Sequence, residues 1–594
     1  METSFFAQQF VPIMFAGLFV LLLSGFPVAF ALAATGLGFG FIGMEVGLFP
    51  STLFQALPLR IFGIMQNDTL LAIPFFTFMG IILERSGMAE DLLETVGQVF
   101  GPVRGGVAIA VILVGALLAA TTGVVAAAVI SMGLISLPIM LRYGYSRTIA
   151  TGTITASGTL AQAIPPSLVL IVLADQLGRS VGDMYAGALI PGLLLVGLYI
   201  LFIVAVAIFR PSMVPALPPE ARIYREDNGA SGHRSLLVLI ALCAVVGFVW
   251  AHFHNPIMAA WIGRTEAAPG DEVVIMSMTV ASLTGLGLSV LNKAARLRLL
   301  SRLAEQVTFV LMPPLILIFL VLGTIFLGVA TPTEGGAMGA IGAIALAAFK
   351  RKITMPLVRQ ALDSTAKLAS FVLFILIGST VFSFTFNAAD GHIWVEHLFD
   401  SMPGGALGFL IVVNVLIFIL GCFIDFFEIA FIVIPLLAPV AEKILPELVP
   451  GMSPDQVMIW FGVIVAMNLQ TSFLTPPFGF ALFYLRSVAP RNDYLDRITG
   501  KNIPAVTTSE IYKGSIAFIV LQLIMVTAVI MVPDLVTGGM EEKKTMDAAE
   551  VMQQLEASSL DEATSDLDAP KDEAASESEK SDEDALKELM SGKK

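Results

Sequence analysis

Two proline pairs stand inside apolar segments, and each follows a short run of residues that offer oxygen atoms or glycine. Ile164-Pro165-Pro166 follows Ser157-Gly158-Thr159, and Thr475-Pro476-Pro477 follows Asn468-Leu469-Gln470. Because proline has no N–H group and its ring clashes with the preceding turn, each pair should interrupt a helix and free backbone carbonyls one turn earlier. Carbonyl, hydroxyl and amide oxygens suit a hard cation such as Na⁺. The predicted chemistry is therefore cation binding at two helix breaks.

The composition is that of a chain that crosses a membrane many times. Of its 594 residues, 56% are hydrophobic and 13% are charged, and the mean hydropathy is +0.86. An average soluble domain has about 25% charged residues. These values exclude a soluble enzyme, a disordered protein and a secreted disulfide scaffold. We therefore expect an all-α polytopic membrane protein.

Twelve apolar segments are interpreted as full crossings, and the proline pairs break two of them. They lie near 10–24, 26–43, 70–84, 148–176, 184–209, 236–254, 273–291, 309–329, 335–349, 368–386, 457–485 and 514–533. Two more apolar stretches, 107–140 and 409–440, have a break in the middle, at Thr121 to Gly123 and at Gly421 to Asp425. Each half is about 15 residues, which is short for a crossing. We expect both to be re-entrant hairpins, buried in protein or lining a cavity.

The basic residues predict the topology. Of the 33 Lys and Arg residues, 22 fall in loops on one side of the expected membrane, four on the other and seven in the C-terminal tail. The positive-inside rule makes the rich side cytoplasmic, so both termini are predicted to be periplasmic. Each broken apolar stretch could be a re-entrant hairpin or two full crossings, and either one returns the chain to the side from which it entered. The charges therefore support the parity of crossings and not the hairpins themselves.

Other chemistry finds little support in the sequence. The five His and two Cys residues show no metal-ligand spacing, and no nucleophile or zinc-protease motif is present. We expect no catalytic residue, no enzyme activity, no cofactor other than a coupling ion and no nucleic-acid partner. The N-terminus lacks the basic region of a cleavable signal peptide. Residues 541–594 hold 17 acidic and seven basic residues, and 534–594 is predicted to be a disordered acidic tail.

The two halves of the chain repeat each other. Ser24 to Pro27 joins one helix pair as Ala330 to Thr333 joins another, and Leu137-Pro138 follows the first hairpin as Ile434-Pro435 follows the second. Each half has five crossings and a hairpin. Five crossings are an odd number, and the two extra helices in 236–291 add an even number. The second half therefore enters the membrane from the opposite side and should be inverted relative to the first. Inverted repeats with broken helices are typical of secondary transporters, which bind ions and substrate at those breaks.

At these residues the chain resembles the large membrane (M) subunit of tripartite ATP-independent periplasmic (TRAP) transporters. The matching stretches are Gly25 to Leu32, Ile73 to Phe76, Ala156 to Ser167, Thr331 to Glu334, Gly421 to Asp425 and Leu474 to Pro477. The likeness runs from about residue 10 to 533 and omits 212–308. Any one stretch is weak evidence, but six in order are specific.

The resemblance implies an elevator-type, Na⁺-coupled importer of an organic acid in the bacterial inner membrane. Its partners would be a small four-helix membrane subunit and a periplasmic substrate-binding protein. The runner-up is a stand-alone Na⁺/dicarboxylate or citrate symporter of the same superfamily; a channel is a third possibility. The implied domains are 1–106 (first scaffold), 107–211 (first transport elements), 212–308 (inserted segment with two extra helices), 309–408 (second scaffold), 409–533 (second transport elements) and 534–594 (tail).

The resemblance also implies the site residues, with Na⁺ in two regions. The first would comprise Thr122, Gly123, Ser157, Gly158, Thr159, Ala163 and Pro166. The second would comprise Gly421, Asp425, Asn468, Leu469, Gln470, Thr475 and Pro477. Substrate would lie between the hairpin tips, and the candidate contacts are Thr122, Ser157, Thr471 and Ser472.

Some residues depart from the family or allow two interpretations. Thr122-Gly123-Val124-Val125 stands where the family often has Ser-Gly-Ser-Ser, which removes hydroxyls from the first tip. Asp425 is costly in an apolar run, so it either serves the ion site or caps a helix at the turn. Glu428 is expected to be interfacial, and Glu334, after a Thr-Pro-Thr turn, is expected to cap the next helix.

Overall fold

The apolar segments of the first half are helices in a computed structural model, which describes residues 9–221, 223, 232–263, 267–296, 299–400, 404–477, 479–496, 498–538 and 540. The first-half elements are α2 (Phe10–Leu23), α3 (Val28–Glu45), η1 (Leu53–Ala56), α4 (Leu57–Met65), η2 (Asp68–Leu71), α5 (Ala72–Leu83), the π-helical η3 (Glu84–Met88), α6 (Ala89–Phe100), α7 (Gly106–Thr122), α8 (Val125–Arg142), α9 (Arg147–Thr159), η4 (Leu160–Gln162), α10 (Leu168–Gln176) and α11 (Val181–Phe209).

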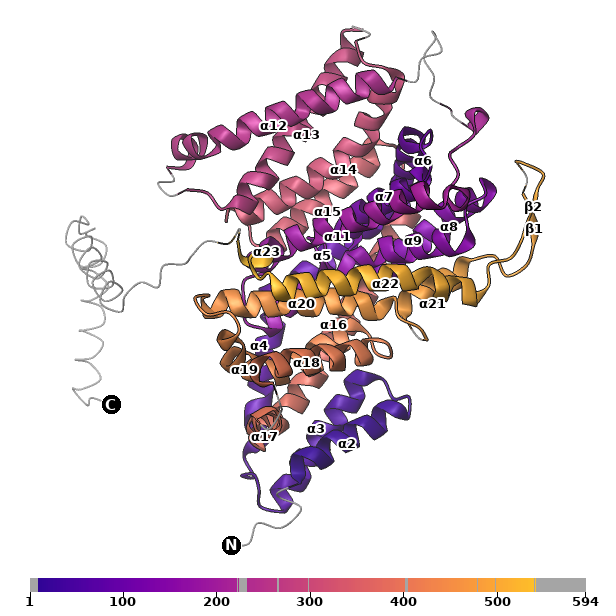
Figure 1. Ribbon diagram of the computed structural model, residues 1–594. Coiled ribbons are helices and arrows are strands. Elements are labelled where there is room, and N and C mark those ends of the chain that lie inside the picture. Colours follow the sequence, from indigo (N-terminus) through magenta and orange to yellow (C-terminus); the bar gives the residue numbers. More distant parts are fainter. Residues whose placement is uncertain are drawn as a thin grey trace, which may run out of the picture. The chain divides into compact units, whose positions relative to one another are not determined.

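The second half repeats this order after a connecting segment that contains two long helices (Figure 1). The connection contains η5 (Pro211–Met213), η6 (Pro219–Ala221), α12 (His233–Ile262) and α13 (Gly270–Ala294). The second-half elements are α14 (Arg302–Phe326), α15 (Pro332–Phe349), α16 (Met355–Ala388), α17 (Gly391–Asp400), α18 (Gly405–Gly421), α19 (Phe426–Ile444), η7 (Leu445–Glu447), α20 (Pro454–Phe473), α21 (Phe480–Val488), the antiparallel pair β1 (Tyr494–Leu495) and β2 (Asn502–Ile503), α22 (Thr508–Met531) and α23 (Asp534–Thr537).

Eleven helices within the described residues are long and apolar enough to cross a membrane, which confirms a multi-pass membrane protein. One premise of the hairpin prediction is wrong. The helices α7, α8, α18 and α19 have 17, 18, 17 and 19 residues rather than about 15, because each continues past the apolar run. Both pairs do turn at the expected breaks. Their re-entrant placement, and the number of twelve crossings, stay predictions.

The start of the predicted disordered tail is also wrong. Residues Asp534–Thr537 form α23, which packs against α11, and Val536 is buried against Gly187. Leu535 is half-buried and Val536 is buried, so this turn lies on the protein. Residues 541–594, where the acidic excess lies, fall outside the described residues.

Two helices in the first part of each half pair reciprocally with two in the other half. Helix α3 packs along α16, and α5 packs along α15. Glycine permits the close approach of α3 and α16. A methyl group added at Gly36 would lie 2.6 Å from the Val381 carbonyl oxygen, and one at Gly378 would lie 2.3 Å from the Ala29 carbonyl oxygen. Small residues at helix crossings are the usual basis of tight packing inside a membrane.

The remaining helices of each half also interlock. Helix α10, after the first break, packs on α19, whereas α21, after the second break, packs on α8. Helix α9 runs against α22, and α20 and α22 lie side by side (Figure 1). Gly152 and Gly514 set the α9–α22 spacing, because a methyl group on either would lie within 2.3 Å of a backbone oxygen of the other helix. Neither half could therefore form this core alone.

The extra helices α12 and α13 pack on each other and on α14. Near the α12–α13 turn, His254 and Glu272 are fully buried, and His254 Nε2 lies 2.8 Å from a Glu272 carboxylate oxygen. Trp250 Nε1–H donates to His254 Nδ1 at 3.1 Å. Because the indole can only donate, Nδ1 accepts and Nε2–H donates to the carboxylate. The pair joins the two helices by a buried polar bond.

Candidate ion and substrate site

The first broken helix is buried on all sides before its break. Every residue from Ile149 to Thr159 in α9 is buried, and the chain then passes through η4 to a cis Pro165–Pro166 peptide bond before α10 begins. The Ser167 hydroxyl donates to the Gln162 carbonyl at 2.9 Å across the break. The predicted interruption of this helix is confirmed, and Ala163 and Pro166 lie within it, also buried.

The other residues of the first predicted region face α7 and α8. A methyl group added at Gly115 of α7 would lie 2.5 Å from Ser157 Cβ, and Gly158 is similarly close to Val129 of α8. Gly123, in the left-handed conformation (φ +58°), turns the chain between α7 and α8 and lies against Leu168. The structure therefore brings the predicted tip and break together. The side chain of Thr122 lies outside the described residues.

The hydroxyls of this region point back to their own helix. Ser157 Oγ donates to the Ile154 carbonyl at 3.0 Å, and Thr159 Oγ1 donates to the Ala156 carbonyl at 2.9 Å. A hydroxyl that donates in this way keeps oxygen lone pairs available to a cation. Gln162, which the sequence reasoning missed, is fully buried, and neither atom of its amide has a hydrogen-bond partner within the described part of the chain. A glutamine three residues before a proline pair was the available signal.

The second broken helix repeats this arrangement. Every residue of α20 from Val457 to Phe473 is buried, and a cis Pro476–Pro477 peptide bond separates it from α21. Ser472 Oγ donates to the Leu469 carbonyl at 2.8 Å, whereas Thr475 Oγ1 donates to the Thr471 carbonyl at 2.9 Å. The predicted break is confirmed here too.

Two more contacts involve predicted residues around this break, a substrate candidate and a member of the second Na⁺ region. Thr471 Oγ1 donates to the Met467 carbonyl at 2.9 Å, so Thr471 shares the back-bonded geometry of its neighbours. The Pro477 carbonyl accepts a 2.9 Å hydrogen bond from the Tyr512 hydroxyl of α22. Pro477 is exposed, unlike its counterpart Pro166.

The hairpin of the second half contacts α20 through two residues of α18. Asn468 Nδ2 donates to the Asn414 carbonyl at 2.7 Å and lies 3.0 Å from the Asn414 side-chain oxygen. A methyl group added at Gly421, the last residue of α18, would lie 2.2 Å from Ser472 Oγ. Gly421, Asn468 and Ser472 are therefore brought together as predicted.

The same contact recurs at equivalent positions of the two halves. Ser157 and Asn468 each stand eight residues before the first proline of their pair, and their partners Gly115 and Asn414 each stand nine residues after the start of a 17-residue helix. The two halves therefore repeat this contact as well as the sequence motifs. Asn414 and Gly115 were missed because neither belongs to a motif.

Asp425 is a helix cap. Its side chain accepts from the Phe427 N–H at 3.4 Å, while the Glu428 carboxylate accepts from the Asp425 N–H at 3.2 Å, which makes a capping box at the start of α19. This is the capping alternative of the sequence interpretation; an ion-site role is untested. Glu428 is half-buried, and its position at the membrane interface stays a prediction. Glu334 forms a capping box with Thr331, as expected.

The Gln470 side chain takes part in a polar cluster that the sequence reasoning missed. Its Nε2 lies 3.5 Å from the Tyr199 hydroxyl, which also accepts from Gln522 Nε2 at 2.8 Å. All three side chains are buried. Gln470 is thus held between α11, α20 and α22, so its side chain serves this core contact. Gln522 inside the apolar α22 was the available signal.

Charged side chains join the two halves beyond both ends of this core. Arg179, between α10 and α11, pairs with Glu442 of α19 and Asp455 of α20. At the other end, Arg142 of α8 pairs with Asp496 in the β1–β2 turn at 3.0 Å.

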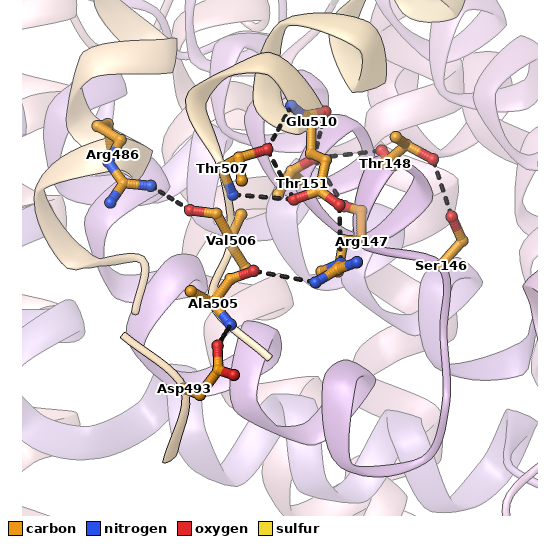
Figure 2. A network of polar contacts seen from close by, with 10 residues as sticks. All are labelled: Ser146, Arg147, Thr148, Thr151, Arg486, Asp493, Ala505, Val506, Thr507 and Glu510. Atoms are coloured by element: carbon orange, nitrogen blue, oxygen red, sulfur yellow. Dashed lines mark hydrogen bonds and ion pairs between the residues drawn. The ribbon is translucent and has the colours of Figure 1, made fainter. Parts of the chain in front are cut away.

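Arg147 is the centre of the polar network in Figure 2. Its guanidinium pairs with Glu510 at 2.8 Å and donates to the Ala505 carbonyl at 3.0 Å. Arg486 of α21 donates to the Val506 carbonyl close by. These contacts fasten the start of α9, in the first half, to the segment that leads into α22, in the second.

Asp496 has a perturbed acidity outside the membrane-spanning helices. The Thr499 hydroxyl donates to its carboxylate at 2.6 Å, and the Thr499 N–H and Arg142 add further donors. Hydrogen bonding from the Thr499 hydroxyl, followed by that from the Thr499 N–H and Arg142, lowers the pKa of Asp496 below its usual value of 3.8. The turn is therefore held by an ionised carboxylate.

The fold and the site define a polytopic membrane protein built from two similar halves, each with a helix pair packed on a broken helix. Residues 15–535 match the family model described as "Tripartite ATP-independent periplasmic transporter, DctM component". The chain belongs to this family, that of TRAP transporter large permease subunits, and the relatives named below are transporter permeases.

Relatives with names extend the comparison. The chain is 26% identical to the C4-dicarboxylate TRAP transporter large permease protein DctM of Pseudomonas aeruginosa, over 75% of this chain and 83% of that protein. It is 22% identical to the isethionate TRAP transporter permease protein DctMQ of Oleidesulfovibrio alaskensis, over 84% and 63% respectively. Identity to the sialic acid TRAP transporter large permease protein SiaM of Vibrio cholerae is 23%, over 79% and 87%.

Among solved structures, the YdaH transporter of Alcanivorax borkumensis is similar. It has a TM-score of 0.45 and 14% identity, and the match covers 81% of this chain and 88% of that one.

Proposed function

We propose that this permease imports an organic acid across the bacterial inner membrane, coupled to Na⁺ and dependent on a periplasmic substrate-binding protein. Relatives in the same family are named for C4-dicarboxylates, isethionate and sialic acid, all of which are organic acids. This supports the class of substrate. The predicted Lys and Arg distribution supports periplasmic termini and cytoplasmic basic loops.

The two predicted Na⁺ regions are the core of the proposal, and one observation carries it. The broken helices meet the hairpins at equivalent residues, Ser157 with Gly115 and Asn468 with Asn414. Each contact lies two turns before a break whose proline pair leaves carbonyls without partners in the helix. Unwound carbonyls and helix ends at matching breaks are the usual ion sites of transporters with repeated halves.

The orphaned amide of Gln162 adds support at the first break. A buried polar group without a partner costs about 1–3 kcal/mol, so a bound ion or water beside Gln162 would stabilise the region. We assign Gln162 to the first site together with Ser157, Gly158, Thr159, Ala163 and Pro166. The substrate would bind between the hairpin tips, with Thr122, Ser157, Thr471 and Ser472 as candidate contacts.

The elevator mechanism is supported by two sets of reciprocal contacts. Helices α3, α5, α15 and α16 pair among themselves and would form the fixed scaffold. The hairpins and broken helices interlock across the halves and would move as one body. The ion pairs of Arg142, Arg147 and Arg179 lie within the second set. A moving body needs such internal ties, and a re-entrant placement of both hairpins would keep their tips inside it.

The partners follow from the family. We propose a small four-helix membrane subunit and a periplasmic binding protein; the relative named DctMQ supports the first, since its name joins both permease parts.

Substitution of equivalent residues in the two halves tests the site. Ser157→Ala and Asn468→Ala should each raise the Na⁺ concentration needed for half-maximal uptake in proteoliposomes. Thr527→Ala is the control, because its hydroxyl donates to its own α22 carbonyl at Leu523 on an exposed face. Half-maximal Na⁺ concentrations equal to that of the control in both site variants would refute the assignment.

A further inference from the structure

A cavity of about 270 Å³ lies among α12, α13 and the first half of α14. Its walls are apolar almost throughout, and the few polar groups include Thr308, whose hydroxyl donates to the Ala304 carbonyl at 2.8 Å. Gly285 forms the floor. A methyl group added there would lie 3.2 Å from Cys243 Sγ and 3.8 Å from Met312 Sδ. The cavity is thus a groove between three helices.

The dimensions of the groove suit one slender chain within one leaflet. Its lining residues on α12 run from Leu236 to Ala244, which is about 12 Å at 1.5 Å per residue. Half of the hydrocarbon core of a bilayer is about 15 Å. The volume lies below the range of roughly 300–1,000 Å³ that holds drug-sized ligands. A helix of another subunit, about 10–12 Å across with its side chains, would not enter it.

The rim of the groove carries several basic side chains and one carboxylate, Glu305, which accepts from Asn292 Nδ2 at 2.6 Å. Arg234 precedes the lining residues of α12 and is exposed, as are Lys293 and Arg296 at the end of α13. The Lys293 ammonium lies 4.8 Å from the centre of the Phe309 ring on α14, next to lining residue Thr308. Basic residues at this level attract the headgroups of anionic lipids.

One buried hydroxyl lies between floor and rim. Ser289 stands one helical turn after Gly285 and one turn before Lys293, and it is fully buried. Its Oγ has no hydrogen-bond partner among the residues that the structure describes. Buried hydroxyls nearly always have a hydrogen-bond partner. A polar group of a ligand between the apolar groove and the basic rim could supply the partner for Ser289.

We propose that this groove binds one acyl chain of an anionic phospholipid, with the phosphate against Lys293 and Arg234. The lipid would come from the leaflet at the basic ends of α12, α13 and α14, which is cytoplasmic in the proposed topology. Only the membrane location of the chain is needed for this inference; it does not depend on Na⁺ coupling or on the substrate.

Native mass spectrometry of the purified full chain tests the site. The protein would be incubated with equal amounts of phosphatidylglycerol and phosphatidylethanolamine, and bound lipids counted. Gly285→Leu should remove one phosphatidylglycerol, because the new side chain fills the groove. The matched control is Gly287→Leu on the same helix, where an added methyl group meets nothing within 4 Å. Equal lipid binding by both variants would overturn the proposal.

The rim and the thiol give independent measurements that need no groove-filling variant. Lys293→Gln should lower the preference for phosphatidylglycerol over phosphatidylethanolamine about fivefold; an unchanged preference would contradict a phosphate at the rim. In a Cys422→Ser background, Cys243 is the remaining thiol. Phosphatidylglycerol should slow its reaction with a maleimide. Protection by the small membrane subunit and not by lipid would replace the lipid with a protein partner and overturn the proposal.

Discussion

Gly115 is the residue whose substitution tests the site most sharply without replacing a proposed ligand. It lets α7 approach the first broken helix, since a methyl group there would lie 2.5 Å from Ser157 Cβ and 2.7 Å from its hydroxyl. Carbon atoms in contact are normally about 3.5–4.0 Å apart. Gly115→Ala must therefore separate the two helices by about 1 Å.

Overpacking of this kind costs about 1–3 kcal/mol. If Na⁺ binds where α7, the first hairpin tip and α9 meet, this free-energy cost destabilises the Na⁺-bound protein. Na⁺ binding should then be about 5- to 150-fold weaker. The assay is thermal unfolding of the purified chain in detergent as a function of Na⁺, with K⁺ replacing Na⁺ to hold ionic strength constant. The midpoint in Na⁺ concentration reports the affinity.

Gly197→Ala is the matched control, because nothing lies within 4 Å of a methyl group at that exposed position of α11. The control should keep the wild-type Na⁺ midpoint. A Gly115→Ala protein that is less stable but has the same midpoint would refute the reasoning, since the contact would then be structural only. Gly421→Ala offers the equivalent test in the second half, where the added methyl group would meet Ser472.

Three further outcomes are expected. Hydrogen-bond donors lower the pKa of Asp496 in the folded protein below 3.8. The stability that Asp496 contributes is therefore present above pH 3.8 and is lost as the pH falls through its folded-state pKa. Thr499→Val should move this loss to higher pH in acid unfolding curves. His254→Ala should lower the free energy of unfolding by about 1.5–3 kcal/mol, measured by thermal unfolding, because it removes the buried bond to Glu272; equal stability would contradict that bond. Glu84 in η3 accepts a hydrogen bond from Ser131 of α8, which links the proposed scaffold to the proposed moving body. Glu84→Gln should weaken this hydrogen bond and change the uptake rate about fivefold. An unchanged rate would mean that this hydrogen bond does not limit the movement.

The breaks and the apolar helices could be predicted from the sequence because each has a strong local cause. A proline pair interrupts a helix whatever its surroundings, and Thr331 with Glu334 caps α15 through a motif three residues long. The hairpin turns at Gly123 and after Gly421 were visible for the same reason. The family followed from several such motifs in order.

The helix lengths and the partners of polar residues could not be predicted so well. Helices α7, α8, α18 and α19 continue past their apolar runs, and some of the added residues, such as Gly405, Glu442 and Lys443, are exposed. Hydropathy does not report where such a helix ends. Asp425 in an apolar run suggested an ion ligand, but its nearest donors are the N–H groups of α19 itself.

Contacts between helices that are distant in the sequence were the least predictable part of the site. Gly115 and Asn414 carry no motif, and their role depends on which helix face meets the broken helix. Tyr199 and Gln470 meet across a sequence separation of 271 residues, and the ion pairs of Arg147 and Arg179 likewise join the two halves of the chain. Such pairings are set by tertiary packing, which a single sequence does not determine.

Substrate uptake into proteoliposomes tests the central claim most directly. The chain would be reconstituted with its small subunit, with and without the periplasmic binding protein, and with or without an inward Na⁺ gradient. The account predicts uptake only when both the binding protein and the Na⁺ gradient are present. Na⁺-driven uptake by the permease without the binding protein would contradict it and would favour a stand-alone symporter.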